Sequence, residues 1–417
     1  MSQATQAAFD ARVDIELDQA PERARVVAAG ASGADIRLSI HEELAGIEQD
    51  WRAFQQSADC TAFQSFEWLS AWQRNVGART GTMPAVIAGR DGIGALMFLF
   101  PLAVEPSGPL RRLTWLGSRL CDYNAPLLAP DFARQVGPAR FTQLWREIAA
   151  RLQSHPHLRH DLVSFDKMPE NVGGQPNPFL QLGVSAHSSG AYLTRLGPDW
   201  EAFYNEKRSS ATRRRDRTKR KKLADFGEVR FVNPALADVG PTLDILFTQK
   251  SQAFAHMGVA DIFARPGYPE FYRDLATGPA TRHLVHVSRL DTGAIPAAVN
   301  LGLMFRGCYY HVLASYDGGE VSKYGPGAAH MHDLMRHAIE RKCTVFDFTI
   351  GDERYKRDWS DTELKLFDHV AAATPRGWPV VIASLAFGRL KRWIKQTPAV
   401  WNAVSKARAF VGSLKGR

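Results

Sequence analysis

The sequence predicts an α/β protein built from two similar halves. Its 417 residues exceed what one small core accommodates, and such a length favours two domains or an internal duplication. A strand, a glycine-containing turn and an apolar strand run from Pro84 to Val104, and the same order begins again at His283. In both places a strand, a loop, a helix and a strand follow, about 200 residues apart. The order of the elements, rather than sequence identity, indicates the duplication.

The elements of the first half follow from local patterns. A strand is expected at 36–40, and a helix at 42–58 because apolar residues recur there at helical spacing. An aromatic-rich helix follows at 63–77, before the hairpin. After the hairpin we expect a strand at 113–118, a loop at 121–131, a helix at 139–152 and a strand at 161–166. The second half repeats this with a strand at 309–317, a loop at 318–327, a helix at 328–342 and a strand at 344–348.

These assignments divide the chain into five parts. The segment PENVGGQPNPF is rich in Gly, Pro and Asn, which is typical of a linker. We expect a flexible N-terminal tail (1–35), a first lobe (36–168), a linker (169–190), a second lobe (191–375) and a basic amphipathic C-terminal segment (376–417).

Composition excludes several classes of protein. The four cysteines lie far apart and form no CxxC, which excludes a disulfide framework and a zinc ribbon and favours a reducing cytoplasm. The N-terminal residues lack the apolar core of a signal peptide. No stretch approaches the roughly 20 apolar residues that a membrane-spanning helix needs. We therefore expect a cytoplasmic protein, whose contact with a membrane would be peripheral.

The net charge of +9 is concentrated in two segments. Residues 207–222 carry ten basic residues and one acid, and residues 376–417 carry no acid. The first segment is suited to the phosphates of an acyl donor, a nucleotide-sugar, a tRNA or another polyanion, or is a solvated helix face. The second alternates apolar and basic residues, which fits either an anionic membrane surface or packing on its own fold.

Residues 323–333 read KYGPGAAHMHD and raise the question of a phosphate site. Gly325 fits the N-cap of a helix, and Pro326 fits its first position, where a missing N–H costs nothing. The first turn contains only Gly, Pro and Ala, so its backbone N–H groups are uncovered and can bind an anion. The alternative is a tight turn with a good cap. The corresponding loop of the first half, 122–134, has no glycine, which favours the phosphate interpretation in the second half.

A strand ending SYD, a loop ending YGPG, a helix and then VFDFTIGDERYKRDW resemble the FemAB-like and CelD-like branch of the GNAT acyltransferase superfamily. FQSFEWLSAW and the basic run before GEVRFV fit the same branch, so the resemblance covers about residues 36–370. It implies tandem GNAT-like lobes, each a mixed, mostly antiparallel sheet flanked by helices. It also implies that the second lobe binds acyl-CoA, or aminoacyl-tRNA as in FemAB members. The pyrophosphate would then lie on the loop made by Lys323, Tyr324, Gly325, Gly327 and Ala328, although a proline in this loop departs from the usual GNAT pattern.

Acyl transfer needs a base, a group that stabilises the oxyanion and a positioned acceptor. The sequence has no GxSxG elbow and no catalytic cysteine motif, so direct transfer from the donor is the simpler mechanism. His311 and Asp317 are six residues apart and are expected on one face of their strand. The candidates are His311, Asp317, Asp352, Tyr355 and Lys356, with Lys356 as an electrostatic partner and with Tyr355 and Lys356 supported by the resemblance. The alternatives are a core histidine and a plain Asp352–Lys356 ion pair.

A metal site is the weaker explanation for the histidines. His330, Asp333 and His337 share one helix face, but the chain has no HExxH and no cysteine joins them. We expect no metal and a solvated helix face.

These observations lead to a GNAT-type N- or O-acyltransferase of the EC 2.3 type that uses acyl-CoA. The CelD-like resemblance implies a small-molecule or glycan-precursor acceptor connected with the cell envelope or with exopolysaccharide biosynthesis. One alternative is a FemAB-type transferase that uses aminoacyl-tRNA to extend a peptidoglycan peptide, which the basic run favours. The other is a non-catalytic assembly factor whose C-terminal segment docks on a membrane complex.

Overall fold

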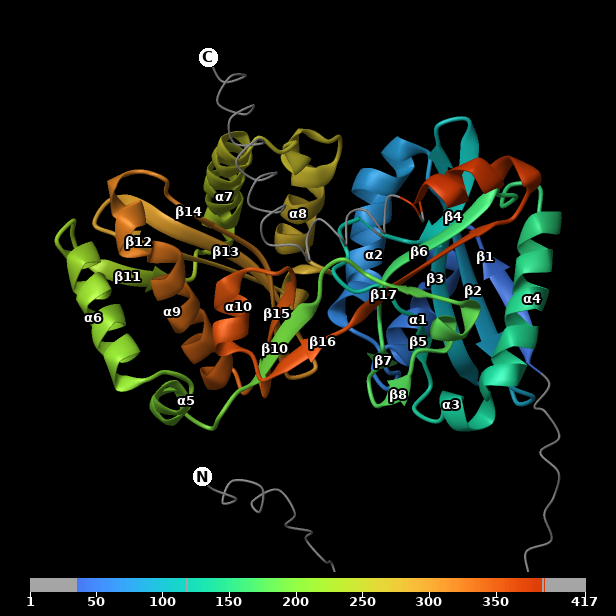
Figure 1. Ribbon diagram of the computed structural model, residues 1–417, viewed down its shortest axis with the longest axis horizontal. Helices are drawn as coiled ribbons and strands as arrows, with labels where there is room; N and C mark the ends of the chain where they lie inside the picture. The colour runs from blue at the N-terminus through green and yellow to red at the C-terminus, as the bar shows by residue number, and fades with distance from the viewer. Residues whose placement is uncertain (1–35, 118, 385, 387–417) are drawn as a thin grey trace, which may run out of the picture. The chain divides into compact units, whose positions relative to one another are not determined.

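The structure is a computed structural model that describes residues 36–117, 119–384 and 386. The main strands of this part of the chain lie in two mixed sheets (Figure 1). The first sheet has the order β1-β2-β3-β4-β6-β17-β9, with β5 beside β3. Its strands are β1 (Arg37–His41), β2 (Met83–Arg90), β3 (Leu96–Ser107), β4 (Leu110–Trp115), β5 (Leu127–Leu128), β6 (Leu162–Pro169), β9 (Ser185–Ala186) and β17 (Leu366–Ala372). Most neighbouring strands are antiparallel, while β4 and β6 are parallel.

The second sheet has the order β11-β12-β13-β14-β15-β10-β16. Its strands are β10 (Ala191–Arg195), β11 (Val229–Val232), β12 (Val285–Thr292), β13 (Ile295–Phe305), β14 (Cys308–Tyr316), β15 (Val345–Ile350) and β16 (Thr362–Leu364). Here β14 and β15 are parallel and the other pairs are antiparallel. Both sheets therefore have the mixed, mostly antiparallel character that the sequence predicted.

Helices cover both faces of the first sheet. The alternation of strand side chains sends Ile87 into a core with α4 (Pro138–Ser154), and Val86 into a second core with α1 (Glu48–Phe54) and α2 (Phe66–Trp72). Four apolar residues of α4 are buried at helical spacing: Phe141, Leu144, Ile148 and Leu152. The hairpin and the three predicted helical regions of the first half are thus confirmed. The aromatic stretch continues beyond α2 as a π-helix and a 3₁₀ turn, η3 (Gln73–Gly77) and η4 (Ala78–Thr80).

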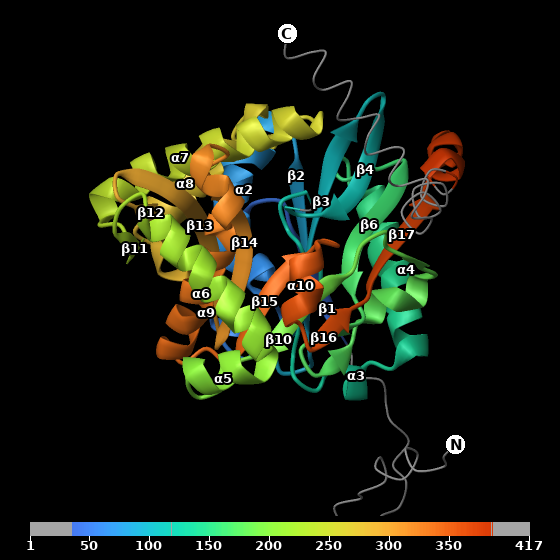
Figure 2. The same ribbon diagram turned by 60° about the vertical axis from the view of Figure 1, so that its left-hand side comes forward.

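The second sheet also lies between two layers of helices. α7 (Leu236–Met257) packs on β12, β13 and β14, and α8 (Tyr268–Thr277) lies beside α7. α9 (Pro326–Glu340) packs on the opposite face of the same strands. α5 (Trp200–Lys207) and α6 (Ser210–Ala224) lie against α9, at the outside of this lobe (Figures 1 and 2). α10 (Arg354–Trp359) follows β15 and contacts β10.

The expected linker at 169–190 needs correction, because most of it belongs to the first lobe. It forms β7 (Asn171–Val172), β8 (Gln175–Pro176), the 3₁₀ turn η5 (Pro178–Leu182) and β9. Phe179 is fully buried and its ring contacts Phe100 (4.9 Å) and Trp115 (4.7 Å) between ring centroids. Asn177 Oδ1 accepts a hydrogen bond from Phe179 N and fixes the turn. The Gly- and Pro-rich composition therefore marks tight turns rather than a spacer.

The expected limit of the second lobe at residue 375 also needs correction. β17 pairs with β6 and β9 in the first sheet, although its neighbour in sequence, β16, belongs to the second. The chain passes between the sheets twice, at 187–190 and at 365. Alternating apolar residues identify a strand but carry no information on which sheet it joins. The predicted tail 1–35 and most of the predicted segment 376–417 lie outside the described residues.

The two lobes share one apolar core. Trp68 of α2 meets the Phe271 ring of α8 edge-on, with 4.9 Å between ring centroids. The same interface includes an ion pair of 2.7 Å between Arg74 Nη2 and Asp274 Oδ2. No helix in the described part of the chain combines the length and hydrophobicity that crossing a membrane requires.

We predict that Phe179→Ala lowers the free energy of unfolding by about 3–5 kcal/mol, because it empties the centre of an aromatic core. Urea denaturation measures this change. The matched control is Gln181→Ala in the same turn, which removes an exposed side chain and should change stability by no more than about 0.5 kcal/mol. Equal effects of both changes would mean that 169–190 is a spacer after all.

Candidate active site

The start of α9 has the geometry that the sequence predicted. Gly325 is the N-cap, with φ +67° and ψ +55°, a left-handed conformation that favours glycine. Pro326 occupies the first helical position. The backbone N–H groups of Ala328 and Ala329 donate to Gly325 O (3.1 and 3.2 Å), so the helix is regular from its first turn.

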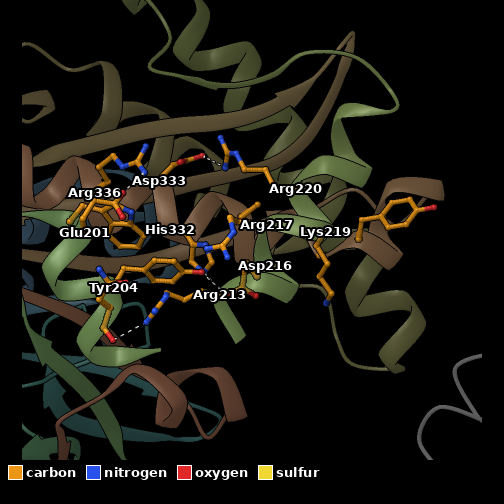
Figure 3. A pocket seen from close by; sticks show the side chains of 16 residues that line it. Glu201, Tyr204, Arg213, Asp216, Arg217, Lys219, Arg220, His332, Asp333 and Arg336 are labelled. Atoms are coloured by element: carbon orange, nitrogen blue, oxygen red, sulfur yellow. Dashed lines mark hydrogen bonds and ion pairs between the residues drawn. The ribbon is translucent and has the colours of Figure 1, made fainter. Parts of the chain in front are cut away.

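The basic run forms α6, and α6 lies beside the start of α9 (Figure 3). A Cβ added to Gly325 would lie 3.6 Å from Lys219 Nζ, so the ammonium group stands over the helix N-terminus. Farther along, Arg220 Nη1 donates to Asp333 Oδ2 (2.8 Å) and joins the two helices. Two features that are about 100 residues apart in sequence therefore form one positive region with the α9 dipole.

A cavity of about 290 Å³ opens between α5, α6 and the first turns of α9. Its charged lining is predominantly basic: Arg213, Arg217, Lys219, Arg220 and Arg336 face Glu201, Asp216 and Asp333. Some of these charges are matched, since Arg220 pairs with Asp333 and Arg336 lies 3.9 Å from Glu201. Arg217 and Lys219 make no ion pair or hydrogen bond with the described residues. The cavity thus has cationic groups available for an anion.

Aromatic side chains form the inner wall of this cavity. Trp200 and Tyr204 stack with 4.9 Å between ring centroids and 13° between planes, and His332 packs on both. Tyr204 OH donates to Asp216 Oδ2 (2.8 Å). Burial lowers the pKa of His332 to about 4, so this imidazole is neutral at pH 7. Flat neutral rings beside unpaired cations can hold a group that is both planar and phosphorylated.

The structure separates the predicted phosphate-binding residues into two groups. Tyr324, Gly325 and Ala328 line the cavity. Lys323 instead holds its Nζ over the Tyr324 ring, 5.1 Å from the centroid, and is outside the lining. Gly327 also lies outside it, with its Cβ position 3.4 Å from the Tyr316 ring. Their assignment to the site stays a prediction.

A second polar region lies where β14 and β15 diverge. These parallel strands pair over three residues, from Cys308 with Val345 to Tyr310 with Asp347. Beyond that point the two strands continue without a shared ladder, to Tyr316 and Ile350. Backbone groups on the separated edges can therefore bond to an extended ligand that enters between the strands.

Thr349 holds a strained conformation at this divergence. Its φ is +60°, which is uncommon for a β-branched residue and marks a candidate functional site. The register of β15 against β10 shifts here, because Tyr192 faces Thr349 while Leu193 faces Asp347. Lys356 Nζ donates to Ile350 O (2.6 Å) and more weakly to Thr349 O (3.4 Å). The strained turn thus presents two carbonyls that hold a buried ammonium group.

Asp347 joins this centre to the first lobe. Its Oδ1 accepts hydrogen bonds from Tyr123 OH and from Thr349 N, both 2.7 Å. Burial raises the pKa of Asp347 to about 7, although the Tyr123 and Thr349 bonds oppose this shift. A carboxyl group with this pKa can exchange a proton near neutral pH.

Further charged groups converge on the same centre, and sequence analysis did not identify them. Asp122 of the first lobe lies close to Thr349 and Lys356, and burial raises its pKa. Lys250 of α7 lies near His311 and Lys356, and burial lowers its pKa. These two residues and Lys356 come from three separate parts of the chain. The only sequence signal is the position of Asp122 in the loop that corresponds to the GPG loop.

His311 belongs to this centre, but Asp317 does not. Burial lowers the pKa of His311 to about 3, so its ring is neutral. The predicted shared face fails because β14 has a register shift, with Leu301 opposite Leu313 and Gly302 opposite His311. The extra residue reverses the alternation. Asp317 lies beyond the strand, where its Oδ2 accepts from Gly319 N (2.9 Å).

The GDERYK stretch is partly helical rather than a loop. Lys356 lies on α10 and is buried. Its Nζ lies 3.3 Å from Glu353 Oε2, so the acidic partner of Lys356 is Glu353 and not Asp352, as the ion-pair alternative had it. Tyr355 packs edge-on against Phe348, and burial raises its pKa. Asp352 lines a separate cavity of about 820 Å³.

The predicted solvated face of α9 is in fact mostly covered by neighbouring elements. His330 Nε2 lies 3.1 Å from Ser288 Oγ, Asp333 binds Arg220, and His337 stacks on His286. Since α6 and β11 lie alongside α9, His330 and Asp333 are buried and His337 is half-buried. Within the described residues, no group of three or more His, Cys, Asp or Glu side chains is arranged for a metal ion.

Comparisons with known proteins agree with this geometry. Residues 210–357 match the family model of the acetyltransferase (GNAT) domain. The solved structure of FemX is similar in fold, with a TM-score of 0.53, 12% identity, and coverage of 79% of this chain and 96% of that one. A conserved protein of unknown function from Bacteroides thetaiotaomicron has a TM-score of 0.51 and 11% identity, with coverage of 80% and 99%. No curated protein matches by sequence. The GNAT match extends from α6 to α10 and contains most of the cavity and the centre around Lys356.

We predict that Asp347→Asn changes how stability depends on pH. A raised carboxyl pKa stabilises the folded state below about pH 4, and this contribution is lost as pH rises through about 7. The wild-type protein should therefore lose stability relative to Asp347→Asn by about 1.4 kcal/mol per pH unit across this range. Asparagine keeps an oxygen for Tyr123 and Thr349, and Asp122 is common to both proteins. Urea denaturation at several pH values measures the difference, and a difference independent of pH would contradict the assignment.

Proposed function

We propose that this chain is an acyltransferase that moves an acyl group from acyl-CoA directly to an amine or hydroxyl group. The observation that carries the proposal is the basic cavity at the start of α9, beside strands that diverge toward a buried lysine. The GNAT match over residues 210–357 supports the same reaction class. The resemblance in sequence to CelD-like proteins supports an acceptor from envelope or exopolysaccharide synthesis. The four unpaired cysteines fit a reducing compartment.

The donor phosphates would bind at the N-terminus of α9. Lys219 and Arg217 supply positive charge, and the positive end of the α9 helix dipole adds to it. The remainder of the donor would extend between β14 and β15, where the separated strand edges offer N–H and C=O groups. The acyl carbon would then reach the region of Thr349 and Lys356.

The chemistry at this end needs charge stabilisation and a proton acceptor. Lys356 is held by two carbonyls, and its ammonium can stabilise negative charge on the acyl oxygen. Asp347, with a pKa of about 7, is the best-matched proton acceptor at neutral pH. His311 stays neutral and packs beside Phe346, with 6.0 Å between ring centroids. Tyr355 and Asp352 remain candidate acceptor-side residues.

A second candidate donor is aminoacyl-tRNA, and α6 favours it. Arg214, Arg215, Lys221 and Lys222 are exposed and lie outside the cavity lining. Lys222 pairs with Asp225 (3.3 Å), and a single CoA molecule in the cavity would leave the other three charges without an anionic partner, whereas an RNA backbone could contact them. This donor predicts binding that weakens steeply with salt.

We predict that Ala328→Glu weakens acetyl-CoA binding at least about tenfold, because it puts a carboxylate where the phosphates would bind. Ala328 is exposed, and an acidic residue in a first helical turn suits the dipole, so folding should be unaffected. Ala328→Gln has nearly the same shape without the charge and should change the Kd little. Isothermal titration measures both.

The outcome distinguishes the two donors. If wild type binds no CoA compound but binds aminoacyl-tRNA in a salt-dependent manner, the tRNA reaction replaces the proposed one. Equal loss in the Glu and Gln variants would mean that shape, and not phosphate charge, determines binding at this position.

A further inference from the structure

The cavity of about 820 Å³ lies where the chain crosses between the sheets. It is lined by three segments, 186–190, 351–357 and 363–367. The first segment leads from β9 to β10, and the third leads from β16 to β17. Both crossings therefore form its walls, and the strained end of β15 forms the rest. Gly351 N donates to Gly190 O (3.1 Å) and connects two of these walls.

This cavity borders the centre around Lys356. Gly351 has φ +143°, a conformation that favours glycine, and it lines the cavity. A Cβ added to Gly351 would lie 2.8 Å from Lys356 Nζ and 2.2 Å from Glu353 Oε2. The cavity wall at this point is therefore only backbone, with the ammonium directly behind it. A molecule in the cavity would lie next to the groups proposed for acyl transfer.

The lining contains charges of both signs. The carboxylates of Asp352, Glu353 and Glu363 face the cavity together with Arg357 and Lys365. Arg357 Nε donates a hydrogen bond to Tyr192 OH (3.1 Å), and Glu353 Oε2 lies 3.3 Å from Lys356 Nζ. Glu363 and Lys365 are exposed and make no ion pair or hydrogen bond with other described residues.

An uncharged lining group also lacks a partner. Ser188 Oγ is shielded from water and has no hydrogen-bond partner within the described part of the chain. A buried hydroxyl group without a partner is costly. A polar ligand in this cavity would relieve that cost once the Ser188 side chain rotates toward it.

We infer that this cavity binds the acyl acceptor, and that the acceptor is a small primary amine that also carries a carboxylate or phosphate group. A ligand with one sign of charge would match only one of the two exposed lining charges, Glu363 and Lys365. An amine that also carries an anion matches both. The inference rests on the proposed acyl transfer and adds the class of acceptor to it.

The reaction balances with these groups alone. The acceptor ammonium loses one proton to the Asp347 carboxylate, the proton acceptor proposed above, and the nearby Lys356 charge favours this loss because two cations repel each other. The nitrogen then forms a bond to the acyl carbon and the C–S bond breaks. The second proton of the nitrogen ends on the thiolate, which leaves as free CoA thiol. The anionic group of the acceptor takes no part in bond changes and serves to position the amine.

The test uses two probes that carry both charges, 4-aminobutyrate and 2-aminoethyl phosphate. Butylamine and butyrate, which carry one charge each, are the reference probes. Isothermal titration without donor should give a Kd for the doubly charged probes at least about tenfold below that of either reference. Glu363→Gln and Lys365→Gln should each remove about tenfold of this affinity, since each loses one charge partner. The matched control Glu170→Gln changes an exposed glutamate of the first lobe, away from the cavity, and should have no effect.

A second readout separates this inference from the proposed function. With acetyl-CoA present, the doubly charged probes should release free thiol and gain an acetyl group detectable by mass spectrometry. Probe binding that Glu363→Gln abolishes, without any thiol release, would support the cavity and reject acyl transfer. The inference is overturned if neither doubly charged probe binds, or if butylamine or butyrate binds as tightly.

Discussion

The divergence of β14 and β15 is the constraint on which the candidate active site depends. Parallel pairing stops after three residue pairs, and Thr349 then takes a left-handed conformation that a continuous ladder would not allow. The carbonyl oxygens of Thr349 and Ile350 accept hydrogen bonds from Lys356 Nζ. The N–H group of Thr349 donates a hydrogen bond to Asp347. If the two strands paired to their ends, the backbone groups of β15 would bond to those of β14. Lys356 and Asp347 would then lose the hydrogen bonds that position them.

The rest of the second lobe contributes two features beside this centre, the basic start of α9 and the cavity at Gly351. On one side, α6 brings Lys219 over the N-terminus of α9, where the donor phosphates are proposed to bind. On the other side, the crossing segments enclose a cavity beside Gly351. The first lobe contributes directly, because Tyr123 bonds Asp347 across the interface. The proposed chemistry therefore uses residues of both lobes.

Much of the fold could be predicted from the sequence, because hairpins, amphipathic helices and a Gly-Pro helix start are local signals. The cap at Gly325 is confirmed, since backbone conformation and residue type determine each other there. Contacts between distant segments were not predictable. Nothing in the sequence of α6 shows that Lys219 meets Gly325, and nothing in 121–131 shows that Tyr123 meets Asp347. The sequence also gives no signal of the register shift in β14, and for this reason Asp317 was wrongly placed on the same strand face as His311. The burial of Phe179 shows that turn-rich composition does not imply a linker.

The central claim is that the Lys356 centre acts on a donor held at a separate phosphate site. The most direct measurement is single-turnover thiol release from acetyl-CoA by wild type and Lys356→Met, with the Kd for acetyl-CoA determined on the same samples. Loss of a group that stabilises developing negative charge should slow transfer by about 10²–10³-fold, while the Kd changes little. Unchanged transfer by Lys356→Met, or a loss of rate explained entirely by weaker acetyl-CoA binding, would contradict the account.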